Sequence, residues 1–191
     1  MEKLIKLLEW LLSALTRRKA APPNPPGPCA VPETERVEPS MPAADAPAFS
    51  SGDRFLAEGV QRRCDHPSLR AWGCYFFALY RWAQELNPLL GAKDYLYWYS
   101  VCVAAGHVID DPALNKRAFI RNAAEVMNTL VGRRLFSTVR HVPLAPEGMP
   151  MFPVRVLNGN SPHFVLQNKL GDVWDSLGGG SYPTVNYREI M

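Results

Sequence analysis

Cys74, His163 and Asp175 are the residues of this chain whose types and positions could together carry out nucleophilic chemistry. Cys74 follows Trp72 and Gly73 at the start of a long apolar run that predicts a helix. The N-terminus of a helix presents unsatisfied N–H groups and a partial positive charge, and both favour a thiolate. The backbone N–H of Cys74 would also be placed to stabilise an oxyanion. Taken alone, Cys74 is better explained as a small buried core residue, because most free cysteines are.

The segment from His163 to Ser176 predicts a β-hairpin that brings an imidazole and a carboxylate together. His163 begins the first strand, residues 168–171 form the turn, and Asp175 lies near the end of the second strand. Opposing residues of an antiparallel pair have Cβ atoms about 5 Å apart, so the two side chains would be neighbours. A carboxylate beside an imidazole fixes its tautomer and orients it as a base. The alternative is that both side chains are solvated at strand ends and form no pair.

Gln61, upstream of Cys74, is the candidate for a second oxyanion contact, since a side-chain amide donor is common in that role. A glutamine is usually no more than polar surface, so its type alone is weak evidence. Gln84 has the same side chain but follows Cys74 within the predicted helix, where it would point away from the N-terminus.

The order of these four residues resembles that of the papain-like cysteine peptidase superfamily, in particular its bacterial C39-like branch, which includes uncharacterised bacterial and phage members. The stretches PHFVL and DVWDS, which contain His163 and Asp175, are the most family-like. The resemblance implies that Cys74 attacks an acyl carbon and that His163 takes its proton. It further implies that Asp175 orients His163 and that Gln61 helps to form the oxyanion hole.

The resemblance implies a thiol-dependent hydrolase of peptide or amide bonds, either a cysteine peptidase or a cell-wall amidase-like enzyme. Its substrate would be a peptide or a peptidoglycan-like molecule, and no metal or organic cofactor is implied. One alternative is a catalytically inactive papain-like binding module, and another is a transferase that uses the same acyl-thioester chemistry. His107, Asp110 and Asp111 could mimic a metal cluster, but their spacing matches no structural zinc site and a turn is expected there.

The charge pattern does not indicate a nucleic-acid partner. The net charge is only +3, whereas nucleic-acid binders usually concentrate basic residues on one face. The lysines and arginines are scattered along the chain, and the sequence has no zinc-finger spacing or long basic run. The four cysteines include no CxxC pair, so we expect them to be mostly reduced thiols.

Residues 1–19 have the periodicity of an amphipathic helix, with leucines on one face and charged residues on the other. Lys6 and Glu9 interrupt the apolar stretch and no clean cleavage site follows, so no cleavable signal peptide is predicted. The stretch is also too short and too charged to span a bilayer. It could dock on a membrane surface or a partner protein, or pack on its own domain or on another copy. The sequence leaves open whether the protein is cytoplasmic or membrane-associated.

Residues 20–54 are rich in Pro, Ala and Ser and predict a disordered linker, because they offer little apolar surface to bury. Residues 55–191 predict one domain of the α+β class, with a helical first half and an antiparallel sheet in the second half. Helices are expected over residues 68–86, 93–105 and 115–131, with a turn at residues 110–112. Strands are expected over residues 135–142, 152–157, 163–167 and 173–176.

Overall fold

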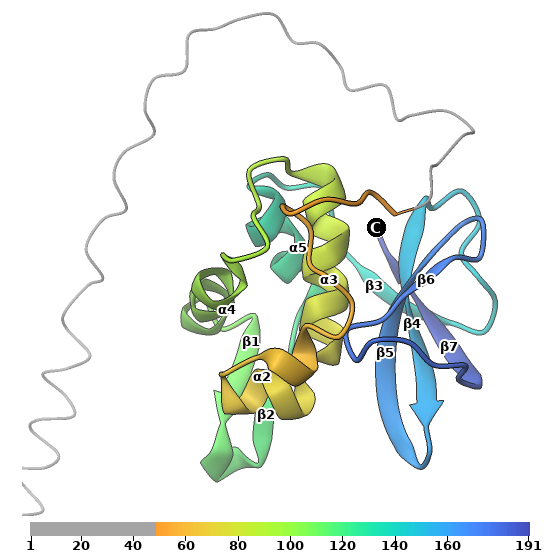
Figure 1. Cartoon of the computed structure of the whole chain (residues 1–191). Coiled ribbons are helices and arrows are strands. Elements are labelled where there is room, and N and C mark those ends of the chain that lie inside the picture. Colours follow the sequence, from red (N-terminus) through yellow and green to blue (C-terminus); the bar gives the residue numbers. More distant parts are fainter. Residues whose placement is uncertain (1–48) are drawn as a thin grey trace, which may run out of the picture. The chain divides into compact units, whose positions relative to one another are not determined.

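The computed structural model describes residues 49–191, which form an α+β domain of helices packed against an antiparallel sheet (Figure 1). The described residues contain four α-helices: α2 (Pro67–Trp72), α3 (Cys74–Leu86), α4 (Tyr95–Ala104) and α5 (Ala123–Val131). Two short 3-10 helices are η1 (Gln61–Arg63), before α2, and η2 (Pro112–Leu114). The strands are β1 (Val108–Asp111), β2 (Lys116–Ile120), β3 (Val139–Val142), β4 (Met151–Asn158), β5 (Ser161–Asn168), β6 (Val173–Trp174) and β7 (Thr184–Ile190).

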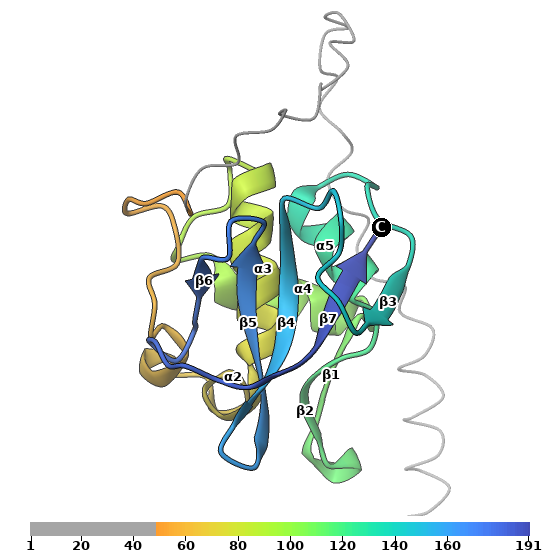
Figure 2. The ribbon, with the colours of Figure 1, turned by 90° about the vertical axis from the view of Figure 1, so that its right-hand side faces the viewer.

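The main sheet has five strands in the order β3-β7-β4-β5-β6, and every neighbouring pair is antiparallel. β4 and β5 form a long hairpin whose register runs from Met151 opposite Asn168 to Asn158 opposite Ser161. β7 enters between β3 and β4, so β3 meets the rest of the sheet only through it (Figure 2). β1 and β2 form a separate two-stranded hairpin beside α2 (Figure 1).

α3 is the central helix of the domain, and its residues from Phe76 to Gln84 are buried without interruption. A helix buried on all sides belongs inside a core, whereas a surface helix shows one apolar stripe. α3 packs on β5 and β4 on one side and on α5 on another (Figures 1 and 2). Its apolar side chains join Leu166, Trp174 and Ile190 of the sheet in the main hydrophobic cluster. This packing fixes the N-terminus of α3 relative to β5.

The structure corrects two of the helices expected from the sequence. The helix expected over residues 68–86 is divided at Gly73 into α2 and α3. The helix expected over residues 115–131 is wrong in its first part, because Asn115 adopts a left-handed φ of 51° and residues 116–120 pair with β1 instead. Strands β1, β2 and β7 were not predicted, and the strand expected over residues 135–142 is confined to β3.

The domain begins earlier than the boundary expected at residue 55. Ser50 donates from its N–H and its hydroxyl to the Glu85 carboxylate at 3.1 and 2.7 Å. Arg81 donates to the Ser50 carbonyl at 2.6 Å, and Gln84 donates to the Arg54 carbonyl at 2.7 Å. The helix expected over residues 1–19 and the rest of the linker expected over residues 20–54 lie outside the described residues. No described helix combines the length and apolar character that crossing a membrane requires.

Candidate active site

Cys74 is the first residue of α3, directly after the break that Gly73 makes between α2 and α3. A Cβ atom at Gly73 would lie 2.5 Å from the Leu69 carbonyl oxygen and 2.9 Å from Leu69 Cα. Only glycine therefore fits at this junction without moving the backbone. The Cys74 side chain is partly exposed and lines a cleft of about 830 Å³. The break thus places a free thiol at a helix N-terminus and at the edge of a cleft.

The break also changes where the Arg70 carbonyl forms its hydrogen bond. In a continuous helix this carbonyl would accept from the N–H of Cys74, four residues later. Here it accepts from Nε2 of Gln61 at 3.2 Å. The helix break therefore leaves the Arg70 carbonyl to the side-chain amide of Gln61. This amide is held at a carbonyl four residues before Cys74, the first residue of α3.

His163 and Asp175 form the buried pair that the hairpin predicts. Nε2 of His163 lies 2.7 Å from Oδ1 of Asp175, and the two residues are 3% and 2% exposed. The pair is diagonal across the ladder, because β5 and β6 align Leu166 with Trp174. The carboxylate also accepts from the Leu177 N–H at 2.8 Å and from the Tyr182 hydroxyl at 2.9 Å. Both carboxylate oxygens are thus held, so the imidazole has a fixed partner.

Electrostatics link Cys74 to this pair. Burial alone would lower the pKa of His163, but hydrogen bonds with Asp175 and with Cys74, together with their charges, raise it to about 9. Burial would likewise raise the pKa of Asp175, yet the hydrogen bonds from His163, Leu177 and Tyr182 hold it below its ordinary value. Since Asp175 occupies Nε2 of His163, the other ring nitrogen is the one available to Cys74. Asp175 thus holds one side of the imidazole by a hydrogen bond, and Cys74 acts on the same imidazole electrostatically.

Tyr182 covers this pair and was not found from the sequence. Its ring meets that of His163 edge to face, with centroids 5.5 Å apart, and its hydroxyl donates to Asp175. A Cβ atom at Gly180 would lie 2.3 Å from the Tyr182 ring, so the absence of a side chain there lets the ring fold back. The glycine run at residues 178–180 is thus part of how Tyr182 is positioned. A tyrosine that follows a glycine run carries no sequence signal for such a role.

Gln61 is held beside the site through the segment that contains Asp175. Its backbone N–H donates to the Ser176 carbonyl at 2.9 Å, and its side-chain oxygen accepts from the Ser176 hydroxyl at 2.8 Å. Gly59 donates to the Asp175 carbonyl at 3.2 Å, and Trp174 Nε1 donates to the Leu56 carbonyl at 3.2 Å. Because Ser176 fixes the amide oxygen, the amide nitrogen turns toward Arg70 and the start of α3. Ser176 is fully buried and was also missed from the sequence.

The other residues considered from the sequence do not form a metal site in the structure. Asp111 caps η2, accepting from the Ala113 N–H at 2.8 Å, in agreement with the turn expected there. Asp110 of β1 lies 3.9 Å from His66, whereas His107 precedes β1. Within residues 49–191, no group of three or more His, Cys, Asp or Glu side chains is close enough to hold a metal ion.

No family model, no curated protein and no solved structure matches this chain.

Proposed function

We propose that this protein is a thiol-dependent hydrolase of peptide or amide bonds, with Cys74 as nucleophile, His163 as base and Asp175 as the residue that orients it. The observation that carries the proposal is that buried His163 is hydrogen-bonded through Nε2 to Asp175, while Cys74 helps to raise the pKa of the same imidazole. A nucleophile, a base and a third group that orients the base are the arrangement that covalent acyl transfer requires. A buried cysteine that served only the core would need neither partner.

The reaction proceeds in two stages. The Cys74 thiolate attacks the carbonyl carbon, and as the C–N bond breaks, the His163 imidazolium gives its proton to the departing amine. His163, now neutral, takes a proton from water, and the resulting hydroxide attacks the thioester. The C–S bond then breaks, which releases the acid and restores the thiolate. The raised pKa of His163 suits the first stage, because the ring carries the proton at neutral pH.

The oxyanion is held by two N–H donors in this proposal. One is the backbone N–H of Cys74, whose position at the helix break leaves the Arg70 carbonyl to Gln61. The other is the second N–H of the Gln61 amide, since the first is bonded to Arg70. Removing one such donor typically costs on the order of 10²-fold in rate. The Gln61→Ala protein would therefore retain the thiol but lose rate.

The papain-like resemblance supports the same assignment. The chain carries a glutamine, then a cysteine at a helix N-terminus, then a histidine on a strand, then an aspartate just after the neighbouring strand. Hydrolysis of a peptidoglycan-like substrate is a narrower form of the proposal that rests on this resemblance alone.

The test is the rate of iodoacetamide alkylation at each cysteine of the native chain, resolved by mass spectrometry at pH 7. Cys102 is the internal control, because burial raises its pKa to about 12 and it is fully inaccessible. We expect Cys74 to label fast and His163→Ala to slow it by about tenfold or more, since the thiolate loses its cation. His107→Ala, outside the site, should leave the rate unchanged.

Two outcomes separate this proposal from its rival. Loss of peptide hydrolysis in Cys74→Ala, with fast labelling of Cys74 in the parent chain, would support the enzyme. Labelling of Cys74 as slow as that of Cys102, with a chain that still unfolds cooperatively, would overturn it. The same fold would then be better explained as a binding module.

A further inference from the structure

The cleft beside Cys74 is lined by four arginines, and no carboxylate side chain lines it. Arg155 and Arg188 come from the sheet, and Arg117 and Arg121 from β2 and the residue after it. Phe119 of β2 and Phe164 of β5 face the same cleft. Clefts lined by one sign of charge concentrate ligands of the opposite sign. The scattered arginines of the sequence are thus gathered here by the fold.

Arg188 is the most unusual of these side chains, because it is only 6% exposed. Its guanidinium donates to the Asn186 side chain and, at 3.4 Å, to the Tyr187 carbonyl. It lies 5.2 Å above the Phe164 ring. No carboxylate within residues 49–191 forms an ion pair with it. A buried charge without an opposite charge is costly to the fold, so its presence indicates a functional demand.

The strand register places two further basic side chains beside Arg188. His141 of β3 stands directly opposite Arg188, and Arg155 of β4 stands opposite Asn186, two residues before it. Residues two apart on a strand share a face, so Arg155, Arg188 and His141 point to the same side of the sheet. Burial and the charges of Arg188 and Arg155 lower the pKa of His141. The lowered pKa favours the neutral imidazole of His141, so the positive charge beside Arg188 is that of Arg155.

Tyr75 adds an unused donor at the same place. It is the residue after Cys74, and its ring stacks on Phe164 with centroids 4.2 Å apart. Its hydroxyl is buried and has no hydrogen bond of good geometry, although it lies near Arg188. Burial raises the pKa of Tyr75 despite the charge of Arg188, so the hydroxyl stays neutral and does not compensate the guanidinium. An unsatisfied buried hydroxyl beside an uncompensated cation is a site for an acceptor with negative charge.

We propose that Arg188, Arg155 and the Tyr75 hydroxyl form a subsite for an anionic group, a carboxylate or a phosphate, that the substrate carries close to the acyl group attacked by Cys74. The inference rests on the proposed function, because it takes Cys74 as the attacking thiol. A peptide or other acyl amide fits this cleft better than a nucleic acid does, since a nucleic acid offers no acyl carbon to the thiol. The substrate class becomes acidic or phosphorylated acyl amides.

The test compares two reagents that differ in charge: neutral iodoacetamide and anionic iodoacetate. Both alkylate the same thiolate, so the ratio of their rates at Cys74 does not depend on how much thiolate is present. The reference is the same ratio in the urea-denatured chain. We expect the native ratio, iodoacetate over iodoacetamide, to exceed the reference by at least about fivefold, the effect of one close charge in water.

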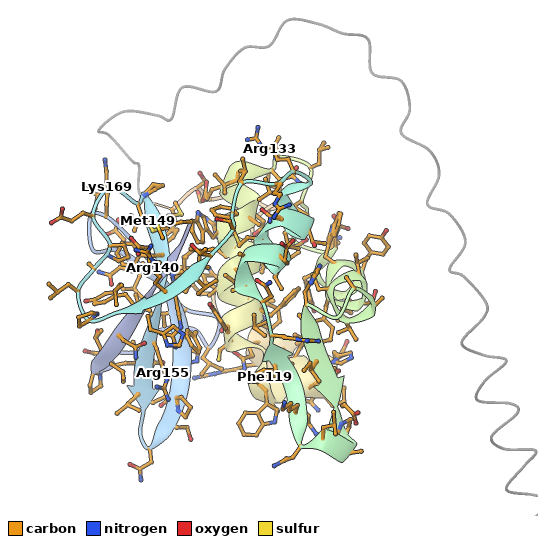
Figure 3. The ribbon with its side chains drawn as sticks, turned by 180° about the vertical axis from the view of Figure 1, so that it is seen from behind. Phe119, Arg133, Arg140, Met149, Arg155 and Lys169 are labelled. Atoms are coloured by element: carbon orange, nitrogen blue, oxygen red, sulfur yellow. The ribbon has the colours of Figure 1, made fainter. Side chains whose placement is uncertain are left out.

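Three variants of the full chain assign the effect to the arginines. Arg188→Leu and Arg155→Gln should each lower the ratio toward the reference, by up to about fivefold, because each removes a cation from the subsite. Arg133→Gln is the matched control, since Arg133 is exposed at the opposite end of the domain from Arg155 and Phe119 (Figure 3). Arg155→Gln, on a partly buried residue, keeps the test decisive if Arg188→Leu fails to fold. An unchanged ratio in all three variants would overturn the proposal. The preference for iodoacetate would then come from attraction by the His163 imidazolium alone.

Competition identifies the anion. At matched ionic strength, protection of Cys74 from iodoacetamide by glutarate indicates a carboxylate, and protection by inorganic phosphate indicates a phosphate. Protection by a single-stranded oligonucleotide alone would overturn the proposal in favour of nucleic acid. Fast labelling by iodoacetamide with no preference for iodoacetate would overturn the anionic subsite and leave the hydrolase standing. Slow labelling by both reagents would instead count against the proposed function itself.

Discussion

At the scale of single residues, the candidate site depends on how firmly Asp175 is held. Its carboxylate receives hydrogen bonds from an imidazole, a backbone N–H and a tyrosine hydroxyl, and it is 2% exposed. Hydrogen bonds to an ionised carboxylate are stronger than those between neutral groups. A carboxylate fixed in this way can orient His163 and stabilise its protonated form without moving.

The protonation of His163 gives the first prediction at this scale. Its ring resonance, followed by NMR, should titrate near pH 9, well above the ordinary value of about 6.5. In Asp175→Asn the midpoint of the His163 titration should fall. Burial lowers the pKa of His163, and the substitution removes one of the negative charges that oppose this effect. His141→Ala is the control, since His141 is exposed on β3 and its own pKa is lowered. A fall of the high-pH midpoint in this variant would contradict the assignment of that midpoint to His163.

The stability of the fold should follow the same titration. A histidine whose pKa is raised in the folded state contributes stability that is fully present below about pH 6.5. That contribution should be lost as the pH rises through about 9. The melting temperatures of the parent chain and of Asp175→Asn should therefore converge between pH 6.5 and pH 10.

Residue types and spacing were enough to propose Cys74, His163, Asp175 and Gln61. Acyl transfer uses these side-chain types, and the local sequence pattern predicted a helix start at Cys74 and a hairpin that joins His163 to Asp175. Ser176 and Tyr182 could not be proposed in the same way. Their roles come from contacts across the fold, between Ser176 and Gln61 and between Tyr182 and His163. Serine and tyrosine are so common in loops that their types alone carry no such information.

At the scale of elements, the site depends on the break between α2 and α3. Gly73 has a negative φ of −79° and a ψ of 2°, so the position does not require the left-handed conformation that favours glycine. What it needs is space, because its Cα lies against the Leu69 backbone. The requirement for glycine is therefore one of close approach.

Gly73→Ala should disturb Cys74 more than it disturbs the fold. The added methyl group must push α2 away from α3, at a cost of about 1–3 kcal/mol in the free energy of unfolding. Alkylation of Cys74 in the folded protein should also slow, by more than the loss of stability alone would cause, because the N–H and the thiol of Cys74 move with the junction. Urea unfolding and site-resolved labelling measure the two effects, and Ala71→Gly in α2, exposed, is the control. Unchanged labelling with reduced stability would show that the junction does not position the thiol.

Two of the strands that sequence reasoning missed lack the local sequence pattern of a strand. β2 follows Asn115 and contains Ala118, both with positive φ, so its conformation is set by pairing with β1 and not by local preference. β7 carries Asn186 and Arg188 on the face toward the helices, where an apolar residue would be expected. The usual alternation fails there because that face lines a cleft. The strand pattern was hidden in part by Arg188, a residue of the proposed subsite.

At the scale of the whole molecule, the segment before η1 belongs to the domain. Arg81 is 1% exposed, forms an ion pair with Glu85 at 2.7 Å, and donates to the Ser50 carbonyl. Phe49 and Phe55 place their rings 5.5 and 4.5 Å from its guanidinium. Phe49 and Ser50, which were expected to be linker, thus help to enclose this buried charge.

A chain that begins at residue 55 should therefore be less stable than one that begins at residue 49. Loss of the Ser50 hydrogen bonds leaves Arg81 and Glu85 poorly satisfied, at a cost of about 2–4 kcal/mol in the free energy of unfolding. Urea denaturation of the two chains measures the difference. Equal midpoints and slopes would show that residues 49–54 add nothing to the fold.

The position of β7 has a consequence for how the protein is made. Residues 184–190 lie between β3 and β4, so the sheet cannot close until this strand has left the ribosome. Domains generally fold as units during synthesis, and non-local strand pairing is the slow part. The thiol of Cys74 emerges long before the strand that carries Arg188. A nascent chain thus exposes the Cys74 thiol before the cleft beside it is complete, so the proposed hydrolysis would require that synthesis has passed β7.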